Sequence, residues 1–288
     1  MANLEKIVTE KSAADTQWQK QRQAERENLT ALQNAGVEAI TTDPEYYTRY
    51  LNMQGDNPTY SAGNIALAMM QGDGVSVFGT SERWQTQGRT VLSTERNKGV
   101  TIFTRPPMGK GYRLTQAYDV TQTQGRELKR PQLLENSKEM EAALTAVLNY
   151  SVVPVVVDKE LPIPALYDQN EMELSVNPDF SDSEAFAAIA AEIAHARLHG
   201  KGYNPGYNRA DCELDAQSVS YILCRRFGIS RDMPDLSRLP QLYEGYDAQD
   251  RRRALDGIQD MSKQFGSSIE KSITPQQRTR PTVRRAVR

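Results

Sequence analysis

The chain has 288 residues, of which 38% are hydrophobic and 25% are charged, and its formal net charge is -2. This length allows more than one core, and the hydrophobic fraction excludes a wholly disordered chain. No apolar run approaches the roughly 20 residues needed to span a bilayer, and the first twelve residues lack a signal-peptide core. We therefore expect a cytoplasmic protein without a membrane partner.

The first part of the sequence predicts helices followed by strands. A polar helical segment at residues 12–34, with Gly36 as its expected stop, precedes two helical segments in TTDPEYYTRYLNM and NPTYSAGNIALAMMQGDG. After Gly74 the pattern alternates in short β-rich runs: VSVFGT, TVLST, GVTIFTRP and YRLTQAYDVTQT. N-terminal helices plus a small curved antiparallel sheet indicate an α+β domain over residues 1–130.

Basic residues concentrate in the predicted sheet. Between Val75 and Arg130 there are ten bases and only four acids, and aromatic residues lie among them. Aromatic rings can stack on unpaired bases while cations follow the phosphates, so the pattern favours single-stranded nucleic acid. An ordinary solvated sheet face is the alternative. The residues expected to bind are Trp84, Arg89, Lys98, Arg105, Lys110 and Arg113.

Tyr60 and Asn64 are about one helical turn apart in YSAGN, and their position is open to two interpretations. They contact DNA, or they brace the helix against the sheet.

A second unit is predicted over residues 131–270, after the linker GRELKRPQ. A helix in ENSKEMEAALTAVLNY, a strand in VPVVVD and a hairpin in PALYDQNEMELSVNPDF precede further helices, which continue to about Ile269. One of these helices runs from Asp182 to Gly200. The remaining residues, 271–288, carry arginines without acids and are expected to be a disordered basic tail.

The segment AEIAH differs by one residue from a zinc-binding motif. In His-Glu-x-x-His, two imidazoles one turn apart share a zinc ion and the Glu polarises the bound water. Here Glu192 and His195 are present, but Ala191 takes the place of the first His, and its methyl group cannot bind a metal. His199 has the right spacing from His195, but it lies about 6 Å further along the helix, away from Glu192.

Four segments in the first part resemble the N-terminal domain of ArdC-type antirestriction proteins, which are encoded on conjugative plasmids and mobile elements. They are YSAGN, WQTQGR, KGVTIF and YDVTQT, in the family's order over residues 44–125. The resemblance implies a domain that binds single-stranded DNA with little sequence preference and thereby opposes restriction.

The second part resembles the zincin-like metallopeptidase domain of that family, which is related to ImmA and IrrE and is mostly helical. The segment ELDA matches the family's E-x-E-A context. The resemblance implies zinc as the cofactor and Glu192 as the general base. It places Asp215, with Glu213 as the alternative, at the position of the acidic ligand that accompanies His195.

Three hypotheses about this second part remain. In the first it is a zinc peptidase that acts on a host or regulatory protein. In the second it binds a metal in a different arrangement, through His195, His199 and Asp215. Alternatively, it keeps the shape of a peptidase without the activity and binds a protein partner. Hydrolytic zinc normally has three protein ligands, and Ala191 leaves this set incomplete, so we expect an inactive or weakly active domain. His199 and Asp215 also have an alternative explanation that involves no metal. The helix dipole favours a cation near a helix C-terminus, where His199 lies, and an anion near a helix N-terminus, where Asp215 lies.

Overall fold

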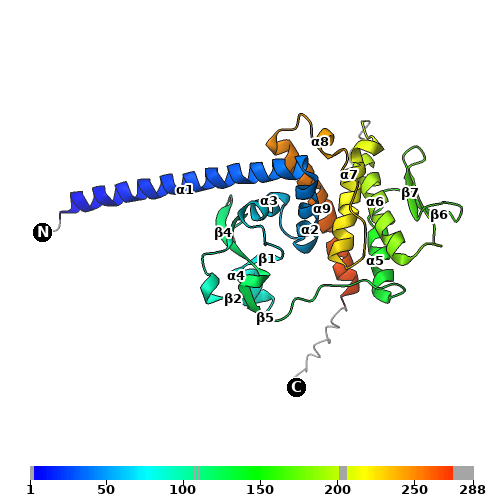
Figure 1. Ribbon diagram of the computed structural model, residues 1–288, viewed down its shortest axis with the longest axis horizontal. Coiled ribbons are helices and arrows are strands. Elements are labelled where there is room, and N and C mark those ends of the chain that lie inside the picture. Colours follow the sequence, from blue (N-terminus) through cyan, green and yellow to red (C-terminus); the bar gives the residue numbers. More distant parts are fainter. Residues whose placement is uncertain (1–2, 107, 109, 201–205, 275–288) are drawn as a thin grey trace, which may run out of the picture.

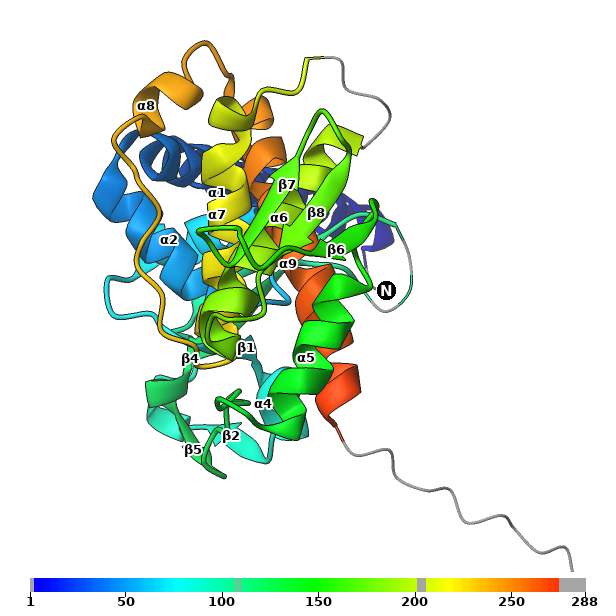
Figure 2. The ribbon, with the colours of Figure 1, turned by 90° about the vertical axis from the view of Figure 1, so that its right-hand side faces the viewer.

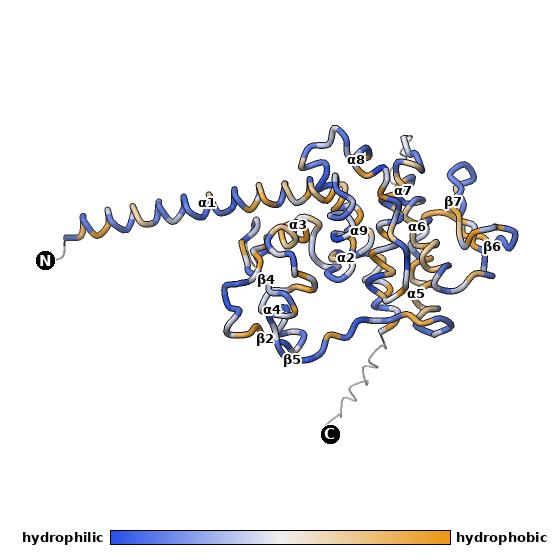
Figure 3. Tube along the Cα trace, viewed as in Figure 1, coloured by the Kyte–Doolittle hydropathy of each residue, from blue (hydrophilic) through white to orange (hydrophobic). Residues whose placement is uncertain are grey.

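The computed structural model describes residues 3–106, 108, 110–200 and 206–274. In Figure 1 a long N-terminal helix, α1 (Leu4–Thr42), projects from a globular body. Residues 3–28 are exposed throughout, and the buried part of α1 begins at Gln33. Figure 3 shows mixed hydropathy along the projecting part, whereas hydrophobic residues gather on the helices of the body.

Gly36 does not end α1, in contrast to the sequence-based prediction. A Cβ atom at this position would lie 3.0 Å from the carbonyl oxygen of Ala66 and 2.8 Å from Cγ of Met70. The glycine therefore allows α1 to pack closely against α3 (Ala62–Gln71). Close approach between helices explains this glycine better than a helix stop does.

The rest of the first part is an α+β arrangement, as predicted. Strands β1, β4 and β3 form an antiparallel sheet in that order, and β2 pairs with β5 in a separate ladder. The bounds of the elements are α2 (Pro44–Asp56), β1 (Phe78–Thr80), α4 (Ser81–Thr86), β2 (Arg89–Val91), η1 (Ser93–Glu95), β3 (Val100–Thr104), β4 (Arg113–Asp119), η2 (Val120–Gln122) and β5 (Thr123–Gly125).

The second part is mainly helical with one small sheet. Its strand order is β6-β8-β7, in which β6 is parallel to β8 and β7 is antiparallel to it, so β7 is an edge strand. The bounds are α5 (Lys138–Leu148), β6 (Val155–Val157), β7 (Ala165–Asp168), β8 (Glu173–Val176), α6 (Asp182–Gly200), α7 (Arg209–Arg226), α8 (Leu239–Leu242) and α9 (Ala248–Ile273).

Helix α7 connects the two parts of the molecule. It packs against α6, α2 and α9, and Figure 2 shows it beside α6, with the β7–β8 hairpin in front of α6. Residues of both parts, such as Tyr47 of α2 and Leu223 of α7, belong to one hydrophobic cluster. Asp56 also pairs with Arg225 at 2.8 Å and with Arg130 at 2.7 Å. The two predicted domains thus share a core, and their division into 1–130 and 131–270 stays a prediction.

The end of the chain is only partly described. Helix α9 continues through Ile273, which includes the first residues of the tail predicted at 271–288, and residues 275–288 lie outside the described part. Among the described residues, none of the helices combines the length and the apolar character that a membrane crossing requires.

Candidate functional site

Helix α6 positions the residues of the segment AEIAH, which was predicted to derive from a metal-binding motif. Ser181 and Glu184 cap its first turn reciprocally: the Ser181 amide donates to the Glu184 carboxylate, and the Glu184 amide donates to the Ser181 hydroxyl. The middle of the helix is rich in alanine and is buried from Phe186 to Ala196 apart from Ala188. Glu192 and His195 lie on this buried stretch, with 5% and 0% of their surfaces exposed.

The carboxylate of Glu192 is fully engaged with neighbouring groups. Its Oε1 accepts a hydrogen bond from Nη2 of Arg209 at 2.6 Å, and its Oε2 accepts one from Nη1 at 2.9 Å. Oε2 also accepts the backbone N–H of Tyr167 at 2.8 Å. The hydrogen bonds to Glu192 raise the pKa of the Arg209 guanidinium. Glu192 is therefore a paired structural carboxylate in this geometry.

His195 is held between two side chains of the second part. Its Nδ1 lies 2.9 Å from the Tyr207 hydroxyl, and its Nε2 lies 3.2 Å from Oε2 of Glu213. The second contact has the distance of an ion pair but not the alignment of a hydrogen bond. The contact with His195 lowers the pKa of Glu213 to about 2, with help from a hydrogen bond donated by Gln217.

Asp215, the residue preferred as the third ligand, faces a different environment. Burial raises the pKa values of Tyr47, Tyr50 and Tyr243, and the nearby carboxylate of the half-buried Asp215 raises them further. Burial raises its own pKa to about 7. Two residues along a helix turn the side chain by about 200°, so α7 directs Glu213 toward α6 and Asp215 toward α2. Glu213 is thus the acidic residue that the fold brings to His195.

His199 lies one turn beyond His195, in an aromatic stack. Its Nδ1 is 2.6 Å from the Tyr167 hydroxyl, and its ring is stacked on Tyr207 with centroids 4.6 Å apart. Within the described ranges, no group of three or more His, Cys, Asp or Glu side chains is arranged to hold a metal ion. With a methyl group at Ala191 and Glu192 engaged by arginine, the residues present do not fit a catalytic zinc centre.

A cleft of about 480 Å³ lies beside the Glu192–Arg209 pair. Ala165 of β7, Ala191 of α6 and Arg231 line it together with these two residues. The sequence analysis did not identify Arg209. The available signal was a cation in the first turn of a predicted helix, where the dipole disfavours positive charge and an acidic partner is to be expected.

Three residues predicted to bind nucleic acid are part of the framework. Trp84 is only 1% exposed and donates its Nε1–H to the Tyr118 carbonyl, so its ring cannot stack on a base. Asn64 exchanges two hydrogen bonds with the backbone of Phe103, at 2.9 and 3.0 Å, and so joins α3 to β3. Arg89 donates to the hydroxyl of Thr123. It also donates to the backbone carbonyls of Val120, Thr123 and Arg126 in the β2–β5 region.

Tyr60 has an intermediate position. It is half-buried, its ring stacks on Phe78 with centroids 4.6 Å apart, and the guanidinium of Arg83 lies over it at 5.1 Å. Of the two interpretations left open for Tyr60 and Asn64, bracing of helix against sheet matches the contacts of both.

Three of the predicted DNA-binding cations lie near the connection between β3 and β4. Arg105, Lys110 and Arg113 are exposed there, and the Arg105 guanidinium lies 5.7 Å from the ring of Tyr112, which is 50% exposed. Arg26 of α1 donates to the Tyr112 carbonyl at 2.6 Å. We call these five residues the hairpin surface.

Lys98 is separate from the hairpin surface. Lys98 precedes β3, whereas Arg105 follows it. The two residues are seven positions apart, which corresponds to about 23 Å in an extended chain. Lys98 also lies 3.4 Å from Glu95 in an exposed ion pair. The fold therefore groups only three of the predicted DNA-contacting cations.

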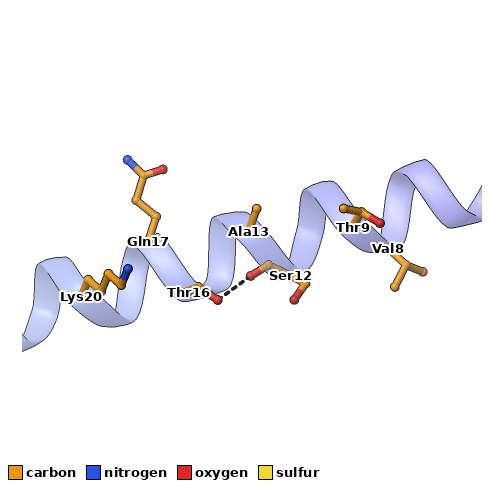
Figure 4. A pocket seen from close by; sticks show the side chains of 7 residues that line it. All are labelled: Val8, Thr9, Ser12, Ala13, Thr16, Gln17 and Lys20. Carbon is orange, nitrogen blue, oxygen red and sulfur yellow. Dashed lines mark hydrogen bonds between the residues drawn. The ribbon is translucent and has the colours of Figure 1, made fainter.

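A further surface lies along the projecting part of α1. Figure 4 shows it between Val8 and Lys20, with every lining side chain on the same helix. One helix does not enclose a ligand, so this surface adds nothing to the candidate site.

Comparisons with known proteins identify the fold. No family model matches the chain. An uncharacterized protein of Bacillus anthracis is 22% identical over 114 residues, and the match covers 39% of this chain but only 19% of that relative.

Two crystal structures of the antirestriction protein ArdC from plasmid R388 are similar over most of the chain. The metal-free structure has a TM-score of 0.54 and 16% identity, and the match covers 83% of this chain and 98% of that one. The Mn(II)-bound structure has a TM-score of 0.51 and 17% identity, and covers 84% and 97%. The resemblance seen in the sequence is thus confirmed for the fold: this chain has the fold of the ArdC antirestriction protein.

Proposed function

We propose that this chain is an antirestriction-type protein of a mobile element that binds single-stranded DNA with little sequence preference. The hairpin surface is the observation that carries the proposal, because it combines four exposed cations with one exposed aromatic ring, that of Tyr112, and the Arg105 guanidinium lies 5.7 Å from that ring. The ArdC fold over 83% of the chain supports the antirestriction assignment.

The chemistry of the hairpin surface suits an unpaired strand. Tyr112 offers a ring on which any base can stack, which accounts for low sequence preference. Arg105, Lys110 and Arg113 carry positive charge for neighbouring phosphates, and Arg26 adds a cation from α1. Such binding weakens as salt rises, because phosphate contacts release counterions.

A fluorescence anisotropy titration with labelled oligo-dT at two salt concentrations tests this proposal. Replacing Lys110 by Ala should weaken binding on all sequences and reduce the slope of log K against log salt by about 0.7. Lys159→Ala is the matched control, since Lys159 is an exposed lysine in the second part. Equal effects of the two substitutions, or no binding of the unmodified protein at low salt, would contradict the proposal.

The peptidase alternative has less support. A general base needs a carboxylate oxygen free to accept a proton from water, and both oxygens of Glu192 are engaged by Arg209 and Tyr167. In our proposal the second part keeps the shape of a peptidase without hydrolysing peptides. Its cleft beside Arg209 and Arg231 is the place where a protein partner would bind.

A further inference from the structure

Two carboxylates, those of Glu192 and Glu213, lie beside the guanidinium of Arg209. Arg209 makes its two hydrogen bonds to Glu192, and its Nε lies 3.8 Å from Oε2 of Glu213. The same Oε2 atom lies 3.2 Å from Nε2 of His195. Two carboxylates thus lie beside one permanent positive charge, and His195 contacts one of these carboxylates.

Electrostatics explain why a cation is required at this point. Glu192 is 5% exposed, and burying a carboxylate without a partner is strongly unfavourable. In a three-ligand site, a divalent metal ion supplies positive charge beside such groups. Here Ala191 removes one ligand, and Ala191, Glu192 and Arg209 line the same cleft.

The pair also reaches the edge of the small sheet. Glu192 accepts the N–H of Tyr167, and Nη1 of Arg209 lies 3.4 Å from the carbonyl oxygen of the same residue. In an antiparallel ladder the N–H and C=O of one residue point to the same side. At Tyr167 that side faces away from β8, so the ion pair takes the place of a neighbouring strand.

We propose that the guanidinium of Arg209 is a built-in replacement for a metal ion. It neutralises Glu192, it links α6, α7 and the edge of β7, and it makes the site independent of metal. The chain therefore neither needs nor takes up a divalent ion at His195. The closed edge at Tyr167 also prevents an extended peptide from pairing with β7 at that residue. This inference does not depend on DNA binding.

Metal uptake by designed variants of the full chain tests the proposal. Mn(II) and Zn(II) are the probes, and the readouts are metal content after dialysis and the change in Tm on adding metal or chelator. The unmodified protein should retain no stoichiometric metal, and its Tm should not respond to chelator. Ala191→His alone should behave in the same way, because Arg209 still occupies the site.

Removing the guanidinium as well should open the site. The double variant Ala191→His/Arg209→Ala should bind one Mn(II) or Zn(II) per chain, at least about tenfold more tightly than Ala191→His alone. Its Tm should rise with metal and fall with chelator. Arg238→Ala combined with Ala191→His is the control, since Arg238 is an exposed arginine paired with Asp211 outside the site.

The double variant can fail to fold, because Glu192 has lost its partner. In that case Glu192→Gln is added to it. This change removes the unpaired charge and keeps the three positions that would bind the metal, 191, 195 and 213. Stoichiometric metal in the unmodified protein that is lost in His195→Ala would overturn the proposal. Equal metal affinity of Ala191→His and of the double variant would overturn it as well.

Discussion

Glu192 and Arg209 are joined by two parallel hydrogen bonds of 2.6 and 2.9 Å, although they lie on different helices. This bidentate geometry is the strongest that arginine and a carboxylate form. Glu192, for which the family resemblance implied the role of a general base, is one half of a structural clamp in this fold.

The clamp should be visible in a double-mutant cycle. Replacing either Glu192 or Arg209 by Ala should lower the free energy of unfolding by about 2 kcal/mol, because the partner is left with an uncompensated charge. Arg209 is about one-third exposed, which reduces the effect below that of a fully buried pair. The double variant should lose less than the sum of the single changes, as measured by urea unfolding. Additive losses would show that the two side chains are not coupled.

Trp84 and Tyr112 should respond oppositely to truncation. Trp84→Ala empties a core position and should lower the free energy of unfolding by about 3–5 kcal/mol. Tyr112→Ala removes a half-exposed ring, so stability should change little while oligo-dT affinity falls by about 1–3 kcal/mol. Urea unfolding and anisotropy on the folded fraction distinguish the two. A Trp84→Ala protein that is stable but has lost DNA binding would contradict the assignment of this residue to the core.

Arg89 and Arg105 form a second contrasting pair. Arg89→Ala removes several hydrogen bonds to the β2–β5 region and should destabilise the fold by about 2 kcal/mol. Arg105→Ala should change stability by less than about 0.5 kcal/mol, because the residue is exposed. Only the Arg105 substitution should reduce the salt dependence of DNA binding. The same salt slope for both variants would argue against the hairpin surface as the contact.

Asp215 should make the stability of the protein depend on pH. Burial raises its folded-state pKa to about 7, above its usual 3.8, so the protonated form is favoured in the fold. Its contribution is therefore fully present below about pH 4 and is lost as the pH rises through 7. The groups that face it are Tyr47 and Tyr50 from α2, Tyr243, and Cys212 of its own helix.

Replacing Asp215 by Asn should remove this part of the pH dependence. Urea unfolding at pH 5 and pH 8 should show a smaller loss of stability in the variant than in the unmodified protein. Asp211→Asn is the control, because Asp211 is an exposed acid of the same helix. Equal slopes for the unmodified protein and Asp215→Asn would rule out Asp215 as the titrating group.

Several elements were predictable because their signals are local. Helix α6 runs from Asp182 to Gly200 as expected. Its start signal, an acidic first turn, and its stop signal, a glycine, both lie within the segment itself and can be recognised without knowledge of the fold. The β7–β8 hairpin was also expected from its alternating residues and the turn between them. Helix α1 begins earlier and ends later than the predicted segment 12–34, and at its far end Gly36 serves a close contact with α3, which no local pattern reveals.

The α+β class, the excess of bases in the first part and the alanine at position 191, where a zinc-binding motif has histidine, follow from the sequence by itself. These properties depend on residue type and on spacing along one element. The packing of distant elements holds Arg89 by hydrogen bonds, leaves Arg105 exposed beside Tyr112, and brings Glu213 rather than Asp215 to His195. It also lets Arg209 neutralise Glu192. Burial and ion pairing depend on how distant elements pack in space, and periodicity along the chain carries no information about that packing.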